Sequence, residues 1–139
     1  MTRYVLGFMF DGNGGVVLIK KQKPVWQMGL YNGVGGKIES GENSRMAMAR
    51  EFEEETGVVT DASDWTYYFT MGGPGWACDC FYVVDPIAVK LVKTTTEEEV
   101  SVELASDLPD TISNLPWLIP MAWNHYQKKD FVATATYGE

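Results

Sequence analysis

Short apolar and β-branched runs separated by glycine-rich breaks dominate the chain, which is the pattern of a domain rich in β-strands. Strand-like runs cover residues 4–10, 16–20, 65–71, 77–84 and 100–104, and residues 131–137 alternate like a terminal strand. Glycine and asparagine between residues 11 and 15 predict a hairpin that joins the first two runs. The glycine-rich residues 24–36 predict a loop with short extended pieces.

Residues 43–56 predict a helix because their composition is helical and because both ends carry suitable signals. Ser40 and Asn43 are both suitable N-caps. Gly57 is a natural C-terminal stop, since glycine adopts the left-handed conformation that ends many helices.

Residues 115–128 predict a second helix, in which Pro116 is tolerated because it falls in the first turn. Pro120 leaves the start of this helix open. Together the elements predict one domain over residues 1–139, in which helices cover a sheet in an α/β or α+β arrangement.

Composition predicts a soluble protein with a substantial core. Hydrophobic residues make up 45% of the chain, but no apolar stretch is long enough to span a membrane. The first residues lead directly into a strand-like run without a signal-peptide region, so we expect a cytoplasmic protein with no membrane contact. Cys78 and Cys80 share one face of a strand, and we expect two reduced thiols rather than a metal site.

The charge balance limits the class of partner. Nineteen acidic residues against 11 basic ones give a net charge of −8. Such a chain is poorly suited to follow the backbone of a nucleic-acid polymer, so no polymer partner is expected. A small polyphosphate substrate would need a bound cation between itself and the protein, provided that the acids cluster.

The acids do cluster, on the first predicted helix. Glu51, Glu54 and Glu55 stand at i, i+3 and i+4, so their carboxylates share one stripe, while Ala49, Phe52 and Thr56 fall on the side that packs against the sheet. Three adjacent carboxylates repel one another, and hard oxygen ligands on one face suit Mg²⁺ or Mn²⁺. The alternative is a solvated acidic helix face.

The surrounding spacing decides between these alternatives. Gly36, five residues, Glu42, seven residues, and then Arg50-Glu51-Phe52-Glu53-Glu54-Glu55-Thr56-Gly57-Val58 resembles the Nudix box in full. The one mild departure is Phe52, which occupies a slot that the family usually fills with an aliphatic residue.

The resemblance implies a fold and a chemistry. Nudix proteins share an α/β/α sandwich with a mixed sheet. By residue-by-residue match, Glu51, Glu54 and Glu55 would be metal ligands together with the Gly36 carbonyl. Arg50, one turn before Glu54, can pair with it and fix the direction of its oxygens. The implied reaction is attack of water on phosphorus, assisted by Mg²⁺ or, in substitution, Mn²⁺.

Many members of the family add a carboxylate from a loop outside the box, as ligand or base. Glu98 in the run Glu97-Glu98-Glu99 is in the right region for this role. An acidic loop tip that is simply solvated is the alternative.

The same resemblance yields four candidate substrate-binding residues, Lys20, Asn32, Lys37 and Asn114. The segment from Asn32 to Lys37 resembles the one that leads into the box in members that hydrolyse purine nucleoside triphosphates, including oxidised ones. Asn32 is therefore a candidate base reader, or else a turn residue beside a glycine. Lys20 is similar in position to a residue near the phosphates, or is surface. Asn114 resembles a second base-contacting residue, or is an N-cap.

Three functions remain open at this point. The first is hydrolysis of a (deoxy)nucleoside triphosphate to a monophosphate and pyrophosphate. The second is hydrolysis of ADP-ribose or a related diphosphate derivative, because Pro74 lies roughly where such members carry a proline. The third is a nucleotide-sensing module without turnover, although such proteins usually lose box carboxylates that this chain keeps. Many relatives are dimers, so a homodimer is a further expectation.

Overall fold

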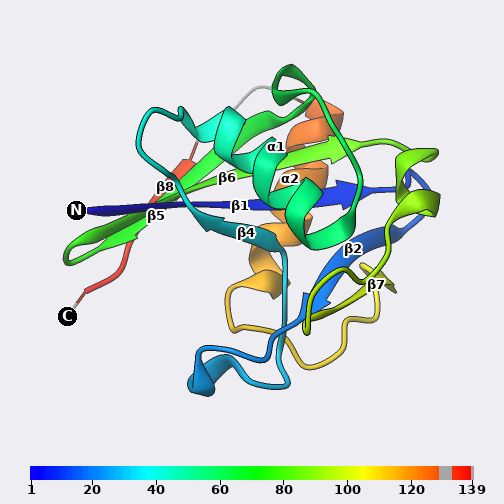
Figure 1. Cartoon of the computed structure of the whole chain (residues 1–139), viewed down its shortest axis with the longest axis horizontal. Coiled ribbons are helices and arrows are strands. Elements are labelled where there is room, and N and C mark those ends of the chain that lie inside the picture. The colour runs from blue at the N-terminus through cyan, green and yellow to red at the C-terminus, as the bar shows by residue number, and fades with distance from the viewer. Residues whose placement is uncertain (129–132, 139) are drawn as a thin grey trace.

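Strand β1 (Thr2–Phe10) runs through the middle of an eight-stranded mixed sheet that is covered by one α-helix on each face (Figure 1). This computed structural model describes residues 1–128 and 133–138. The other strands are β2 (Gly15–Lys20), β3 (Tyr31–Asn32), β4 (Val34–Lys37), β5 (Thr66–Gly73), β6 (Trp76–Val84), β7 (Glu99–Leu104) and β8 (Ala133–Thr136). The helices are α1 (Ser44–Thr56) and α2 (Leu115–Lys128), and the short 3-10 helices are η1 (Val25–Gln27), η2 (Ala62–Asp64) and η3 (Ala88–Leu91).

The sheet has the strand order β3-β2-β1-β6-β5-β8, with β4 paired to β1 and β7 paired to β2. β1 runs parallel to β6 over its whole length, whereas its other edge changes partner. Residues Tyr4 to Gly7 pair antiparallel with β4, and only Phe10 pairs with β2. The predicted hairpin is present, closed by a hydrogen bond from the Asp11 amide to the Gly15 carbonyl at 3.1 Å.

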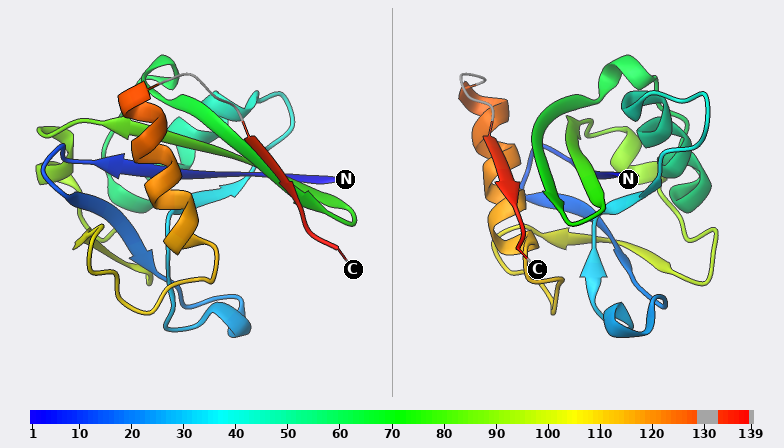
Figure 2. Two further views of the ribbon diagram at one scale, coloured as in Figure 1. Left: turned by 180° about the vertical axis from the view of Figure 1, so that it is seen from behind. Right: turned by 90° about the vertical axis from the view of Figure 1, so that its left-hand side faces the viewer.

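Two separate hydrophobic cores lie on the two faces of the sheet, because successive strand residues point to opposite sides. In β1, Leu6, Phe8 and Phe10 pack with α2, whereas Val5 and Met9 pack with α1. Figure 2 shows the resulting three layers edge-on, with α2 and α1 on opposite sides of the sheet. The α/β/α sandwich with a mixed sheet that the sequence predicted is confirmed.

Helix α1 has the ends that its sequence predicted. The Asn43 side chain accepts a hydrogen bond from the Met46 amide, so Asn43 rather than Ser40 is the N-cap. Gly57 ends the helix with a φ of 77°, a value that a side chain disfavours. The face against the sheet includes Phe52 and Thr56 as predicted, but Ala47 and Met48 are also fully buried and Ala49 is only partly so.

Helix α2 covers the predicted residues 115–128, with Pro116 in its first turn and Pro120 inside it. The predicted terminal strand forms over Ala133–Thr136, and residues 131 and 132 lie outside the described residues. Within the described chain, neither helix has the length and apolar character that a membrane crossing requires.

Candidate active site

Arg50 of α1 fixes the acidic stripe through hydrogen bonds from all its guanidinium nitrogens. Its Nε and Nη2 donate to the two carboxylate oxygens of Glu42 at 2.7 and 2.9 Å, which is a bidentate pair. Its Nη1 donates to Glu51 at 2.9 Å and to Glu54 at 3.1 Å. Nη2 also donates to the Lys37 carbonyl at 2.9 Å, which ties α1 to strand β4. Arg50 therefore positions three of the box carboxylates and the loop between β4 and the helix.

The two glycines of β4 allow this strand to lie directly against the carboxylates. A Cβ atom on Gly36 would overlap an oxygen of the Glu51 carboxylate, and one on Gly35 would overlap the backbone carbonyl oxygen of Val5. The Gly35 amide donates to a Glu55 oxygen at 3.2 Å. Backbone and carboxylates are therefore in contact at this point: position 35 requires glycine, and a side chain at position 36 would displace the Glu51 carboxylate.

Burial changes the protonation of the stripe. Burial, with the neighbouring Glu51 carboxylate as the second cause, raises the pKa of Glu55 to about 8. Burial also raises the pKa of Glu51, although Arg50 acts against it. The hydrogen bonds from Arg50 instead hold the pKa of Glu42 below its ordinary value. Binding of a proton or a cation at Glu55 therefore offsets the unfavourable free energy of a buried negative charge next to Glu51.

The stripe supplies the hard oxygen donors that Mg²⁺ prefers, but it does not enclose a cation. Within residues 1–128 and 133–138, no three carboxylate, histidine or cysteine side chains converge as a metal site. One oxygen each of Glu51 and Glu54 accepts a hydrogen bond from Arg50, and no described residue donates to the second oxygen of either carboxylate. An open, carboxylate-lined stripe of this kind fits Mg²⁺, which keeps several waters and takes further ligands from substrate phosphates.

Glu98 is held within the fold by three hydrogen bonds. Its carboxylate accepts from the Lys21 ammonium at 3.0 Å and from the amides of Gln22 at 2.7 Å and Lys23 at 3.4 Å. Burial alone would raise the pKa of Glu98, but these hydrogen bonds outweigh it and lower the pKa. With 6% of its surface exposed, Glu98 is not a solvated loop tip.

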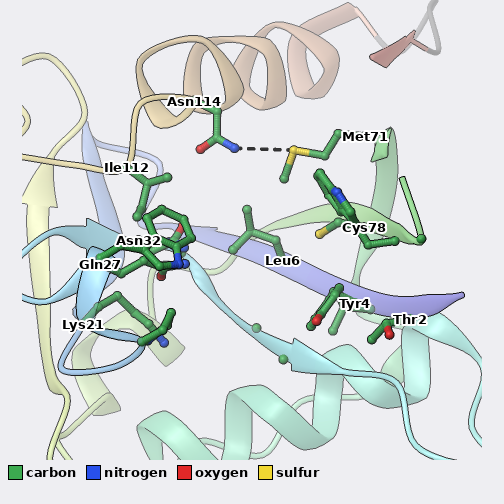
Figure 3. Close-up of a pocket in the computed structure, with 18 residues that line it drawn as sticks. Thr2, Tyr4, Leu6, Lys21, Gln27, Asn32, Met71, Cys78, Ile112 and Asn114 are labelled. Atoms are coloured by element: carbon green, nitrogen blue, oxygen red, sulfur yellow. Dashed lines mark hydrogen bonds between the residues drawn. The ribbon is translucent and has the colours of Figure 1, made fainter. Parts of the chain in front are cut away.

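A cavity of about 740 Å³ opens beside the stripe, and Gly35 and Gly36 form part of its wall (Figure 3). Its other walls come from β1, the start of β6, the loop after β2 and the segment before α2. Leu6, Met71 and Ile112 give the cavity an apolar floor. This volume is in the range of pockets that hold nucleotide-sized ligands.

Asn32 and Asn114 both line this cavity although they are far apart in sequence (Figure 3). The side-chain oxygen of Asn32 accepts a hydrogen bond from the Gly33 backbone amide at 2.8 Å, so the turn orients the side-chain amide of Asn32. The Asn114 amide nitrogen donates to the Met71 sulfur at 3.5 Å, and its buried oxygen has no hydrogen-bond partner among the described residues. Asn114 thus carries a buried, unsatisfied acceptor beside the cavity and does not cap α2 with its side chain.

The two predicted lysines lie elsewhere. Lys20 is not among the residues that line the cavity, and it has the strand parity of Val16 and Leu18, which pack in the core on the α2 face. Lys37 is exposed and contributes its carbonyl to Arg50. Lys21, one residue further along, lines the cavity and pairs with Glu98.

Sequence reasoning missed Lys21 and the function of Glu42. Strand parity was the available signal for Lys21, because Val17 and Ile19 pack on the α1 face where the carboxylates lie. Glu42 belongs to the box pattern, but only the fold shows that its carboxylate takes two of the Arg50 nitrogens. As predicted, Cys78 and Cys80 are free buried thiols.

The turn that carries Pro74 lies at the far end of the cavity. Gly75 and Trp76, which follow the proline, line the wall there. Trp76 is stacked on Tyr137, with the ring centroids 5.7 Å apart.

Known structures of several differently named proteins share this fold. A MutT protein from Bacillus halodurans is similar over 99% of this chain and 90% of that chain, with a TM-score of 0.72 and 20% identity. An ADP-ribose pyrophosphatase from Streptococcus suis is similar over 98% of both chains, with a TM-score of 0.71 and 12% identity. The NUDIX domain of NrtR from Shewanella oneidensis, complexed with ADP ribose, covers 89% of this chain and 87% of its own, with a TM-score of 0.69 and 18% identity.

At these identities the structural likenesses establish the fold and leave the substrate open. No curated protein shows significant sequence similarity to the chain. The NUDIX domain family, however, matches residues 1–131, which include the whole carboxylate stripe and both asparagines of the cavity. The chain therefore belongs to the NUDIX domain family.

Proposed function

We propose that the protein is a Mg²⁺-dependent pyrophosphohydrolase of (deoxy)nucleoside triphosphates, oxidised purine nucleotides among them, which releases a monophosphate and pyrophosphate. The observation that carries this proposal is the juxtaposition of the carboxylate stripe and a nucleotide-sized cavity across Gly35 and Gly36. The stripe suits the polyphosphate and its cation, and the asparagine-lined cavity suits a base.

Glu51, Glu54, Glu55 and the Gly36 carbonyl would hold the cation. When bound, Mg²⁺ supplies charge neutralisation for the phosphates and lowers the pKa of water that attacks phosphorus. The protein's own part is to fix these ligands, since Arg50 orients Glu51 and Glu54 while the Gly35 amide orients Glu55. Mn²⁺ substitutes because it accepts the same oxygen ligands.

Asn32 and Asn114 would read the base. An amide side chain offers two donors and an acceptor, which suits the edge of a purine. The unsatisfied Asn114 oxygen would gain a donor from a purine amino or imino group, and such a gain is worth most where the acceptor is already buried.

The product pattern tests this proposal. Protein with Mg²⁺ is incubated with the common nucleoside triphosphates, an oxidised purine triphosphate and ADP-ribose, and products are identified by phosphorus NMR. Pyrophosphate and a monophosphate from one or a few triphosphates is the expected result. Hydrolysis that survives chelation of all divalent metal would contradict the role of the carboxylates.

Glu54→Gln separates an enzyme from a sensing module, because it removes one charge from the stripe without changing its shape. We expect kcat to fall by about 100-fold or more, because the substitution removes a proposed metal ligand. Glu53→Gln is the matched control, since Glu53 lies on the same helix but is exposed and outside the stripe. If Glu54→Gln and Glu53→Gln respond equally to nucleotide and hydrolyse it at equal rates, the sensing module is favoured over the enzyme.

Hydrolysis of ADP-ribose or a related derivative to two monophosphates is the second candidate. It is favoured by the extension of the cavity to Gly75 and Trp76, beyond the region of the two asparagines. Cleavage of ADP-ribose with all triphosphates untouched would establish this candidate in place of the first.

A further inference from the structure

The loop between β2 and β3 forms a compact turn that is closed by backbone hydrogen bonds. The Lys21 amide donates to the Leu30 carbonyl at 2.9 Å, and the Gly29 amide donates back to the Lys21 carbonyl at 2.8 Å. Inside the turn, the Gln27 amide donates to the Pro24 carbonyl at 2.9 Å. The Glu98 carboxylate anchors the start of the loop, as described above. The side chains at the tip, including η1, are therefore displayed from a fixed backbone.

Trp26, at the centre of η1, is 69% exposed and lines the cavity. The other four tryptophans of the chain each pack on another aromatic ring: Trp65 on Phe52, Trp117 on Phe69, Trp123 on Phe10 and Trp76 on Tyr137. No described ring contacts Trp26. An indole can bury 150–250 Å² (roughly) in an interface, so an exposed one on a rigid cavity wall leaves a large contact unmade.

The neighbours of Trp26 on this wall are polar. Gln27 and Asn32 line the same cavity, and Figure 3 shows both on the side of Lys21. A flat aromatic face combined with side-chain amides suits a ligand that is itself flat, aromatic and rimmed with donors and acceptors. A nucleobase has this chemistry, whereas a sugar or a free polyphosphate does not.

We propose that Trp26 is a substrate-binding residue that stacks on the base of the nucleotide substrate. This inference rests on the proposed function, since it takes the ligand to be a nucleotide. Stacking tolerates any base, so Trp26 supplies affinity for the class of substrate, and the asparagines supply discrimination within it.

Binding measured without turnover tests the inference independently of catalysis. Calorimetric titration with the α,β-methylene analogues of the four nucleoside triphosphates, in Mg²⁺, gives Kd for the wild type, Trp26→Ala and Trp26→Phe. Val25→Ala is the matched control, because Val25 is exposed in the same turn but does not line the cavity. Methylenediphosphonate serves as the probe that has no base.

We expect Kd for the analogues to rise about 5- to 150-fold in Trp26→Ala, the usual effect of removing a stacking ring, and to change little in Trp26→Phe. Binding of methylenediphosphonate should be the same in all variants. Equal Kd values for Trp26→Ala and Val25→Ala, or a wild type that binds no analogue, would overturn the inference. Ring-dependent binding together with no hydrolysis of any triphosphate would support stacking and contradict the proposed function.

Discussion

At the scale of single residues, Arg50 is the group on which most of the site depends. Five donor directions of one planar fork reach three carboxylates and a carbonyl of strand β4. Its pKa is raised, chiefly by the hydrogen bonds to Glu42, so the charge is present at every pH at which the protein folds. Lysine keeps that charge but cannot reproduce the fork.

Arg50→Lys should therefore lower kcat by about 10- to 100-fold, the usual cost of losing a group that orients metal ligands. Initial rates at saturating Mg²⁺ are the measurement. Arg3→Lys is the control, because Arg3 forms a single ion pair with Asp79 away from the stripe. Comparable rates in both variants would show that charge alone suffices at position 50.

Glu55 predicts how the stability of the metal-free protein depends on pH. Its pKa is about 8 in the folded protein against an ordinary value of 4.5. The folded state therefore holds an extra proton between these values, and stability falls as pH rises from about 4.5 to 8. Glu55→Gln removes this proton uptake, so after chelation the variant should have the higher Tm at pH 8.5 and a flatter profile. Thermal melts from pH 5 to pH 9 test this, and parallel profiles would contradict it.

At the scale of elements, the ends of two distant segments are joined at Glu98. The carboxylate just before β7 binds the backbone just after β2, so the turn that displays Trp26 depends on a residue about 70 positions further along the chain. With both carboxylate oxygens accepting hydrogen bonds inside the protein, this geometry favours a positioning role for Glu98 over that of a free base.

Glu98→Gln should consequently affect binding more than chemistry. The amide cannot accept from Lys21 and both backbone amides at once, so we expect Tm to fall by about 5–10 °C, for a loss of about 1.5–3 kcal/mol. KM should rise severalfold while the pH profile of kcat keeps its shape. Glu97→Gln is the control, since Glu97 is exposed and forms only a surface pair with Lys23. A kcat that no longer depends on pH would instead assign Glu98 as the base.

At the scale of the whole molecule, the protein carries a net charge of −8, and Mg²⁺ bound at the carboxylate stripe should stabilise its fold. If the carboxylates bind Mg²⁺ with a Kd near 1 mM, 10 mM Mg²⁺ adds about 1.4 kcal/mol to the free energy of unfolding. That corresponds to a rise in Tm of about 3–5 °C for a domain of this size. NaCl at equal ionic strength controls for general screening of the acidic surface. The Mg²⁺-specific part of the shift should vanish in Glu54→Gln and persist in Glu53→Gln.

The sequence predicted those parts of the molecule that depend on local signals. Helix α1 was predicted from its cap at Asn43 and its stop at Gly57, and most strands from apolar and β-branched runs between glycine-rich breaks. The box pattern supplied the family and the stripe, because its residues stand within one continuous segment. The cavity was out of reach, since its walls come from segments as distant as Asn32 and Asn114, which only the tertiary fold brings together. Lys20 illustrates the limit, because a shift of one residue in a strand changes the face.

The two cores described above separate the proposed chemistry from part of the proposed recognition. Glu51 and its neighbours stand on the α1 layer, whereas Asn114 and Met71 belong to the α2 layer. Side chains on opposite faces of a sheet share few partners, and substitutions at sites without shared partners usually have additive energetic effects. Substitutions in the α2 layer can therefore change which base is recognised while the reaction at the α1 layer stays the same. This separation makes the sandwich a scaffold for divergence in substrate.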